Sequence, residues 1–195
     1  MCAALYMFCV AALADTIKGT MYTDLTGKFP VRSYKNNQYV FVAYFYSLNA
    51  IIVRSMPNRT DASMVATFKD IIEELKSCGH QPQLNVMDND CSKAVQQYIT
   101  SEKNNIQLVE PHDHRVNTAE RAIQTFKHHF IAGLATVDID FPIQLWDEFL
   151  PQAQMTLNML RTSRQDNTKT AYEELKGPFD FNKTPLAPLG TKALI

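Results

Sequence analysis

The chain has 195 residues, of which 46% are hydrophobic and 20% are charged, and its formal net charge at pH 7 is −1. These values are ordinary for a globular protein, and the length suits a single domain with its own hydrophobic core. The nearly neutral balance excludes a chain that binds polyanions through its overall charge. Acidic residues are concentrated between positions 61 and 120, where they indicate either a cation site or exposed helix faces.

The N-terminal segment, residues 1–17, opens with the apolar run MCAALYMFCVAALA. This run is too short to span a membrane as a helix. It resembles the apolar part of a signal peptide but lacks the basic start, so we expect neither a membrane anchor nor secretion. We interpret it as an apolar leader of open status, either a truncated gene start or a leading strand. The four cysteines form no CxxC pair, which indicates a reduced intracellular protein without a zinc knuckle.

Three strands are expected first, because β-branched and aromatic residues are enriched between turn signals. The first strand lies in TMYTDLTGKFPV and runs into a turn at Thr26 and Gly27. The next two lie in NNQYVFVAYFYSLNAIIVRSMP, with a tight turn near Asn49. We expect these three strands to form an antiparallel meander.

Helical periodicity begins after the meander. Thr60 or Asp61 is the expected start of a helix that ends at Gly79, and Ser92 is the expected cap of a second helix. Two short strands, LNVMD and NIQLVEP, lie on either side of that second helix.

Two longer helices and one short helix are expected in the C-terminal half. The first runs from about Asn117 to Ala135, the next from Pro142 to about Arg161, and the short helix lies in AYEELKG. Three strands followed by alternating helices and strands predict an α/β fold with a mixed five-stranded sheet flanked by helices.

Three acidic residues occupy unusual places in these elements. Asp24 lies inside the first strand, where a carboxylate is disfavoured. Asp88 ends the fourth strand, and Glu120 lies in the first turn of the helix that starts at Asn117. Functional sites in such sheets gather where strands end and helices begin, so the three carboxylates are candidates to converge.

Converging carboxylates would suit Mg²⁺ or Mn²⁺, which prefer oxygen ligands and keep waters and substrate phosphates. Two such ions stabilise both the attacking and the leaving oxygen of a phosphoryl transfer. A rigid strand favours Asp24 as the bridging ligand, with Asp88 and Glu120 on either side. Each acid also has a simpler interpretation: Asp24 as a turn residue, Asp88 as part of an Asx turn, and Glu120 as a capping partner of Asn117.

The chain resembles the integrase catalytic core of retroviruses and long-terminal-repeat retrotransposons, the DDE family with a ribonuclease H-like fold. The three motifs occur in order as YTDLTG with Asp24, MDND with Asp88, and HRVNTAERAIQTFK with Glu120. The later segments LPQAQMTLNMLRTS and PLAPLG are similar to the region after the core in the copia-like branch. The resemblance covers about residues 18–190 and implies a catalytic core at 18–165 followed by a tail at 166–195.

The sequence also departs from the family pattern. Thirty-one residues separate Asp88 from Glu120, slightly fewer than usual, and Asp90 follows Asp88 closely enough to compete for the ligand role. Neither a His/Cys zinc module nor a basic DNA-binding domain is visible. These departures keep open the alternative of a decayed or co-opted fragment that binds nucleic acid or a protein without catalysis.

The resemblance implies a polynucleotidyl transferase that trims the 3′ ends of element DNA and joins them to target DNA. Two Mg²⁺ or Mn²⁺ ions would be held by Asp24, Asp88 and Glu120. The implied partners are the element ends, the target DNA and further copies of the chain. The implied location is the nucleus or a cytoplasmic particle of the host cell.

The helix from Asn117 to Ala135 is expected to divide into two faces. One face carries a stripe for the core, which comprises Ala119, Ile123, Phe126, Phe130 and Leu134. A neighbouring stripe carries Glu120, Gln124 and Lys127, so Gln124 and Lys127 are candidates to contact DNA. Lys127 is equally explained as a solvated lysine. Asn117 and the more peripheral Arg121 complete the predicted DNA contacts, while the histidines of PHDHR are not expected to bind zinc.

Overall fold

A computed structural model of the chain describes residues 19–88, 91–109 and 117–191, with side chains described from Glu120 onward in the last range. The predicted leader, Asp90 and the loop histidines between residues 111 and 115 lie outside the described residues. In the described parts of the chain, no helix is both long and apolar enough to cross a membrane.

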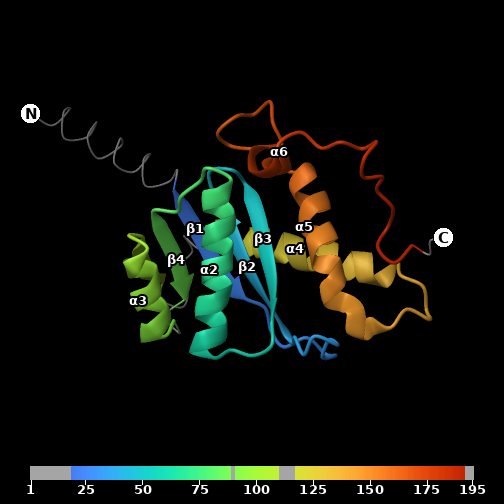
Figure 1. Ribbon diagram of the computed structural model, residues 1–195, viewed down its shortest axis with the longest axis horizontal. Coiled ribbons are helices and arrows are strands. Elements are labelled where there is room, and N and C mark those ends of the chain that lie inside the picture. The colour runs from blue at the N-terminus through green and yellow to red at the C-terminus, as the bar shows by residue number, and fades with distance from the viewer. Residues whose placement is uncertain (1–18, 89–90, 110–116, 192–195) are drawn as a thin grey trace, which may run out of the picture.

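The five strands form one mixed sheet, as predicted (Figure 1). The sheet order is β3-β2-β1-β4-β5, with β1 pairing antiparallel to β2 and parallel to β4. β2 and β3 are antiparallel, whereas β4 and β5 are parallel. The strands are β1 (Thr20–Leu25), β2 (Tyr39–Phe45), β3 (Ala50–Met56), β4 (Leu84–Asp88) and β5 (Asn105–Val109). This α/β architecture is ribonuclease H-like.

Local chemistry explains the connections that the sequence predicts. Asn49 closes the turn between β2 and β3 at φ 55°, a left-handed conformation that asparagine tolerates better than most residues. Thr60 caps α2 (Asp61–Ser77) by accepting a hydrogen bond from the Ser63 amide, and Ser92 caps α3 (Lys93–Ser101) in the same way. These turns and caps confirm the predicted element starts.

The C-terminal half differs from expectation at one point. α4 (Asn117–Ala135) and α6 (Ala171–Lys176) lie where predicted. The single helix expected between Pro142 and Arg161 is wrong, because the segment forms a 3₁₀ helix, η2 (Ile143–Phe149), followed by α5 (Leu150–Met159). Pro151 is the reason: it has no N–H for a bond to the preceding turn, so it suits a helix start and not a helix interior.

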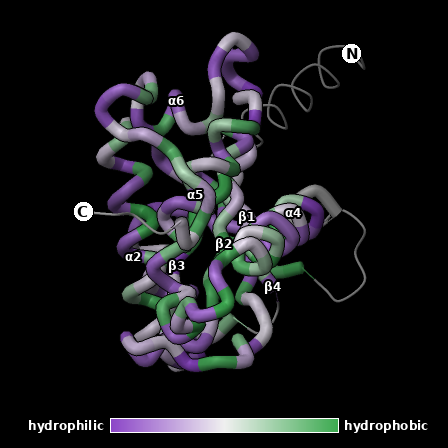
Figure 2. Tube along the Cα trace, turned by 90° about the vertical axis from the view of Figure 1, so that its right-hand side faces the viewer, coloured by the Kyte–Doolittle hydropathy of each residue, from purple (hydrophilic) through white to green (hydrophobic). Residues whose placement is uncertain are grey.

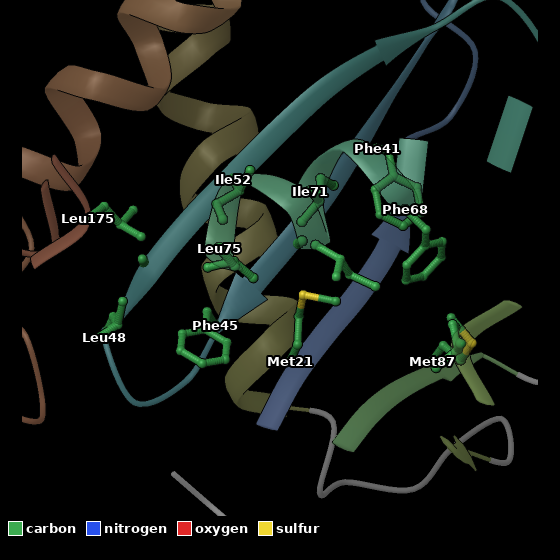
Figure 3. Packing of buried hydrophobic residues seen from close by; sticks show 14 of the residues in the cluster. Met21, Phe41, Phe45, Leu48, Ile52, Phe68, Ile71, Leu75, Met87 and Leu175 are labelled. Atoms are coloured by element: carbon green, nitrogen blue, oxygen red, sulfur yellow. The ribbon is translucent and has the colours of Figure 1, made fainter. Parts of the chain in front are cut away.

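The two faces of the sheet bury separate hydrophobic cores. Because side chains alternate along β2, Phe41, Ala43 and Phe45 face α2, α3 and α6. The intervening Val40, Val42 and Tyr44 face α4, η2 and α5. Figure 2 shows α2 and α4 on opposite sides of the strands, and Figure 3 shows the packing of the first core. The division of the chain at residue 165 stays a prediction, since the tail helix α6 contributes to that core.

The outer edge of the sheet is covered by α5, which lies beside β3 in Figure 1. Asn158 accepts a hydrogen bond from the Ile51 amide at 2.9 Å and donates one to the Ile51 carbonyl at 2.8 Å. One turn earlier on α5, Gln154 accepts a bond from the Val53 amide at 2.8 Å. Two amide side chains thus satisfy backbone groups that an exposed edge strand would leave unpaired.

Candidate functional site

Asp24 and Asp88 lie at the carboxyl ends of neighbouring parallel strands. The register of β1 and β4 pairs Thr20 with Leu84 and Tyr22 with Val86. Extending this register by two residues brings Asp24 opposite Asp88. This end of adjacent parallel strands is where ligands bind in open α/β sheets.

The two aspartates line one small pocket of about 130 Å³. Its walls come from β1, β2, β4 and the starts of α2 and α3. The lining residues are Thr23, Asp24, Leu25, Phe41, Arg59, Asp61, Met64, Met87, Asp88, Cys91, Ser92 and Val95. The lining thus combines apolar residues with three aspartates and one arginine.

Asp24 also reaches the side of the sheet covered by α4. It is paired with Val42, whose side chain belongs to the core on that side, and directly opposed residues of an antiparallel pair share a face. The Leu25 amide donates a hydrogen bond to Asp24 Oδ1 at 2.7 Å. The carboxylate is thereby held in one orientation at the strand end.

The surroundings raise the pKa of the Asp24 carboxyl above its ordinary value. Although the residue is exposed, the surrounding protein removes water from part of its carboxylate, which is the largest cause. The negative charge of Asp88 acts in the same direction. The Leu25 hydrogen bond and the positive charges of Lys127 and Arg59 oppose the shift without cancelling it. A cation bound between Asp24 and Asp88 would favour the charged form of Asp24 and so oppose this rise in pKa.

Glu120 is not brought into the same pocket. It is exposed in the first turn of α4 and is absent from the residues that line the pocket. Across the described residues, no three His, Cys, Asp or Glu side chains are grouped so as to hold a metal ion. The structure therefore brings together two of the three predicted carboxylates, and the role of Glu120 stays a prediction.

The predicted DNA contacts on α4 differ in how close they lie to the aspartates. Lys127 is half-buried, and its positive charge lowers the pKa of the Asp24 carboxyl, while its contact with DNA stays a prediction. Gln124 and Arg121 are exposed on the same helix. The side chain of Asn117 lies outside the described residues.

Two solved structures share this arrangement of strands and helices. A chain of the simian T-cell lymphotropic virus intasome, in complex with PP2A regulatory subunit B56 gamma, aligns with a TM-score of 0.63 at 18% identity. The catalytic core domain of BIV integrase aligns with a TM-score of 0.59 at 15% identity. The chain has an integrase-like fold.

The alignments cover most of this chain. The intasome match covers 91% of this chain and 60% of the other, and the BIV match covers 81% and 93%. No protein-family profile matches the sequence, and no curated protein matches it. At these identities the likeness establishes the integrase-like fold and leaves the activity to be argued from the residues.

Asp24 and Asp88 have the chemistry to bind a divalent cation. Both residues line one pocket and carry carboxylate oxygens, the ligand type that Mg²⁺ and Mn²⁺ prefer. Such ions are commonly held by one or two carboxylates together with waters and substrate phosphates. The donor set of this integrase-like fold is thus chemically suitable with Asp24 and Asp88 alone.

Arg59 is a site residue that the sequence did not reveal. It belongs to none of the three DDE motifs, and its local signal for this site is its position directly before the helix cap Thr60. It reaches the pocket because β1 and β3 both run antiparallel to β2, so their carboxyl ends lie at the same edge of the sheet. Because Arg59 lies far from Asp24 and Asp88 in the sequence, the sequence alone did not indicate that the three residues share a pocket.

Proposed function

We propose that the chain is the catalytic core of a retroelement integrase that cuts and joins DNA. One observation carries the proposal: Asp24 and Asp88 line one pocket at adjacent parallel strand ends of an integrase-like fold. The DDE motifs and the tail segments favour a copia-like long-terminal-repeat retrotransposon as the source. DNA ends, target DNA and further copies of the chain are the partners, and the nucleus or a cytoplasmic particle is the location.

In this proposal Asp24 and Asp88 hold Mg²⁺ or Mn²⁺ with their carboxylate oxygens. Divalent cations, when bound, supply the Lewis acidity that stabilises the phosphodiester transition state. Glu120 completes the ligand set from the start of α4. Lys127 contacts a phosphate of the DNA, since it already lies close to Asp24.

The reaction proceeds as two in-line displacements at phosphorus. First, a water oxygen loses a proton as it bonds to phosphorus near the element end, the bond to the 3′ oxygen breaks, and that oxygen takes up a proton to become a 3′ hydroxyl. Next, this hydroxyl loses its proton and attacks a phosphorus of the target strand, and the 3′ oxygen of the target leaves and takes up a proton. No covalent bond to the protein forms in either step.

Metal-dependent cleavage tests the proposal directly. The full chain is incubated with supercoiled plasmid in Mg²⁺, in Mn²⁺ or in EDTA, and nicked and joined products are measured. Asp24→Asn, Asp88→Asn and Glu120→Gln should each abolish metal-dependent products. Glu73→Gln, an exposed change on α2, is the matched control and should retain them. Full activity in any one of the three site variants refutes the role of that residue.

A second function is favoured by the placement of Glu120 outside the pocket. In this alternative the chain is a decayed or co-opted integrase fragment that binds nucleic acid or a protein partner without catalysis. DNA binding that weakens with salt, together with no metal-dependent product from wild-type protein, supports this alternative over the first.

A further inference from the structure

Arg59 and Lys127 belong to segments that lie on opposite faces of the sheet. Lys127 comes from α4, which packs on one face of the sheet, whereas Arg59 precedes α2, which packs on the other. Arg59 lines one pocket together with Asp24, and α4 packs on the face of the sheet that Asp24 shares with Val42. The candidate catalytic carboxylate is therefore flanked by two cations supplied from two separate layers of the fold.

The turn that carries Arg59 is held by its neighbours. Asn58 Oδ1 accepts hydrogen bonds from the Thr60 amide at 3.1 Å, the Thr60 hydroxyl at 2.6 Å and the Ser63 hydroxyl at 2.7 Å. These bonds connect the residues on both sides of Arg59 to the first turn of α2. The backbone of Arg59 is thus ordered before any ligand binds, which lowers the entropy cost of a contact.

Arg59 has no acidic partner within ion-pair distance among the described residues. This is notable because three aspartates, Asp24, Asp61 and Asp88, line the same pocket. By contrast, Arg54 on β3 forms ion pairs with both Asp70 and Glu74. The Arg59 side chain is exposed and lines the pocket, so its guanidinium donors can bind an external anion.

We infer that Arg59 binds a backbone phosphate of the nucleic acid on the α2 side of the pocket, opposite the phosphate that Lys127 contacts. A guanidinium matches phosphate geometry through two parallel hydrogen bonds. A nucleic-acid strand that crosses Asp24 then contacts one positively charged side chain on each side of the reacting phosphorus. This subsite rests on the proposed function, and Arg59 is a positioning residue that fixes the strand on the carboxylates.

The test measures binding of a fluorescent DNA duplex to the full chain in EDTA, which removes any contribution from metal ions. Arg59→Gln should weaken binding about tenfold at about 0.1 M salt, because each phosphate contact contributes about 0.9 to the salt slope. The slope itself should fall by about one. Arg59→Lys, which keeps the charge, should retain the slope.

Lys69→Gln is the matched control, since it removes one positive charge from the exposed face of α2. It should leave both affinity and slope unchanged. Lys127→Gln should weaken binding independently of Arg59. If Lys127→Gln weakens binding and Arg59→Gln does not, the subsite is refuted while the proposed function stands.

Two further outcomes separate the explanations. If wild-type protein binds no DNA, the proposed function fails, and the subsite fails with it. If Arg59→Gln leaves DNA binding intact but tightens Mn²⁺ binding in calorimetry, then Arg59 only balances the charge of the aspartates, and the subsite is overturned. Thermal melting of each variant confirms that the fold is retained.

Discussion

Removing the amide of Asn158 should destabilise the fold through the backbone of β3. Asn158 is buried on α5 and is bonded to both the amide and the carbonyl of Ile51. Asn158→Leu keeps the side-chain volume similar but leaves two buried backbone groups without partners. Each unsatisfied group costs about 1–3 kcal/mol, so we expect a loss of about 2–6 kcal/mol in the free energy of unfolding.

A graded comparison tests whether the hydrogen bonds are the cause. Gln154→Leu removes one bond, the one from the Val53 amide, in a half-buried position, and should cost about 1 kcal/mol. Asn167→Leu, on an exposed loop, should be close to neutral. We therefore expect Asn167→Leu to be the most stable of the three variants, Gln154→Leu the next and Asn158→Leu the least stable.

Urea denaturation followed by tryptophan fluorescence measures these differences. The chain has one tryptophan, and Trp146 is fully buried in the core that α5 covers, so its emission reports on the loss of that core. Hydrogen exchange at the Ile51 amide should accelerate in Asn158→Leu. An Asn158→Leu protein within about 0.5 kcal/mol of wild type would refute the edge-protection argument.

Three further changes should give measurable effects. Asp24→Asn should raise the melting temperature at pH 7 without metal, because the raised pKa of Asp24 means that its charged form is disfavoured in the folded state. Glu74→Gln should destabilise the fold by about 1–3 kcal/mol at pH 7. Burial alone would raise the pKa of Glu74, but hydrogen bonds from Lys176 and Arg54 outweigh it and lower the pKa. The loss should therefore be present above pH 4.5 and disappear as the pH falls through the lowered pKa, as urea titrations at several pH values would show. Gly190→Ala should loosen the C-terminal segment, because Gly190 adopts a left-handed φ of 71° and a methyl group there would overlap Val137, and limited proteolysis after residue 180 should accelerate.

The elements of this fold are largely encoded by local sequence. The turn at Asn49, the caps Thr60 and Ser92, and the whole of α4 follow from residues within a few positions of each other. Such signals act through one turn of backbone and need no tertiary contact. The mixed sheet followed from the order of these elements. The boundary between η2 and α5 was not predicted, because the prediction followed the hydrophobic pattern through this segment and did not take the missing N–H of Pro151 into account.

The candidate site could be predicted from local sequence only in part. Asp24 was expected inside a strand and Asp88 at a strand end, and they could be predicted as joint ligands because functional sites in such sheets gather where strands end and helices begin. The orientation of Glu120 could not be predicted, since the start of α4 permits either a capping role or a metal-facing one. Glu120 is exposed and lies outside the pocket, so its role stays a prediction.

The sequence by itself determined the five strands, the helices apart from the break between η2 and α5, and the two aspartates of β1 and β4 as candidate ligands. Only the tertiary structure decided which residues from distant segments meet. It brought Arg59 and Asp24 to one pocket, placed the helix of Lys127 on the other face of the sheet from α2, and paired Asn158 with the edge of β3. The physical reason is that strand order and helix docking depend on contacts between residues far apart in the chain, which no local propensity specifies.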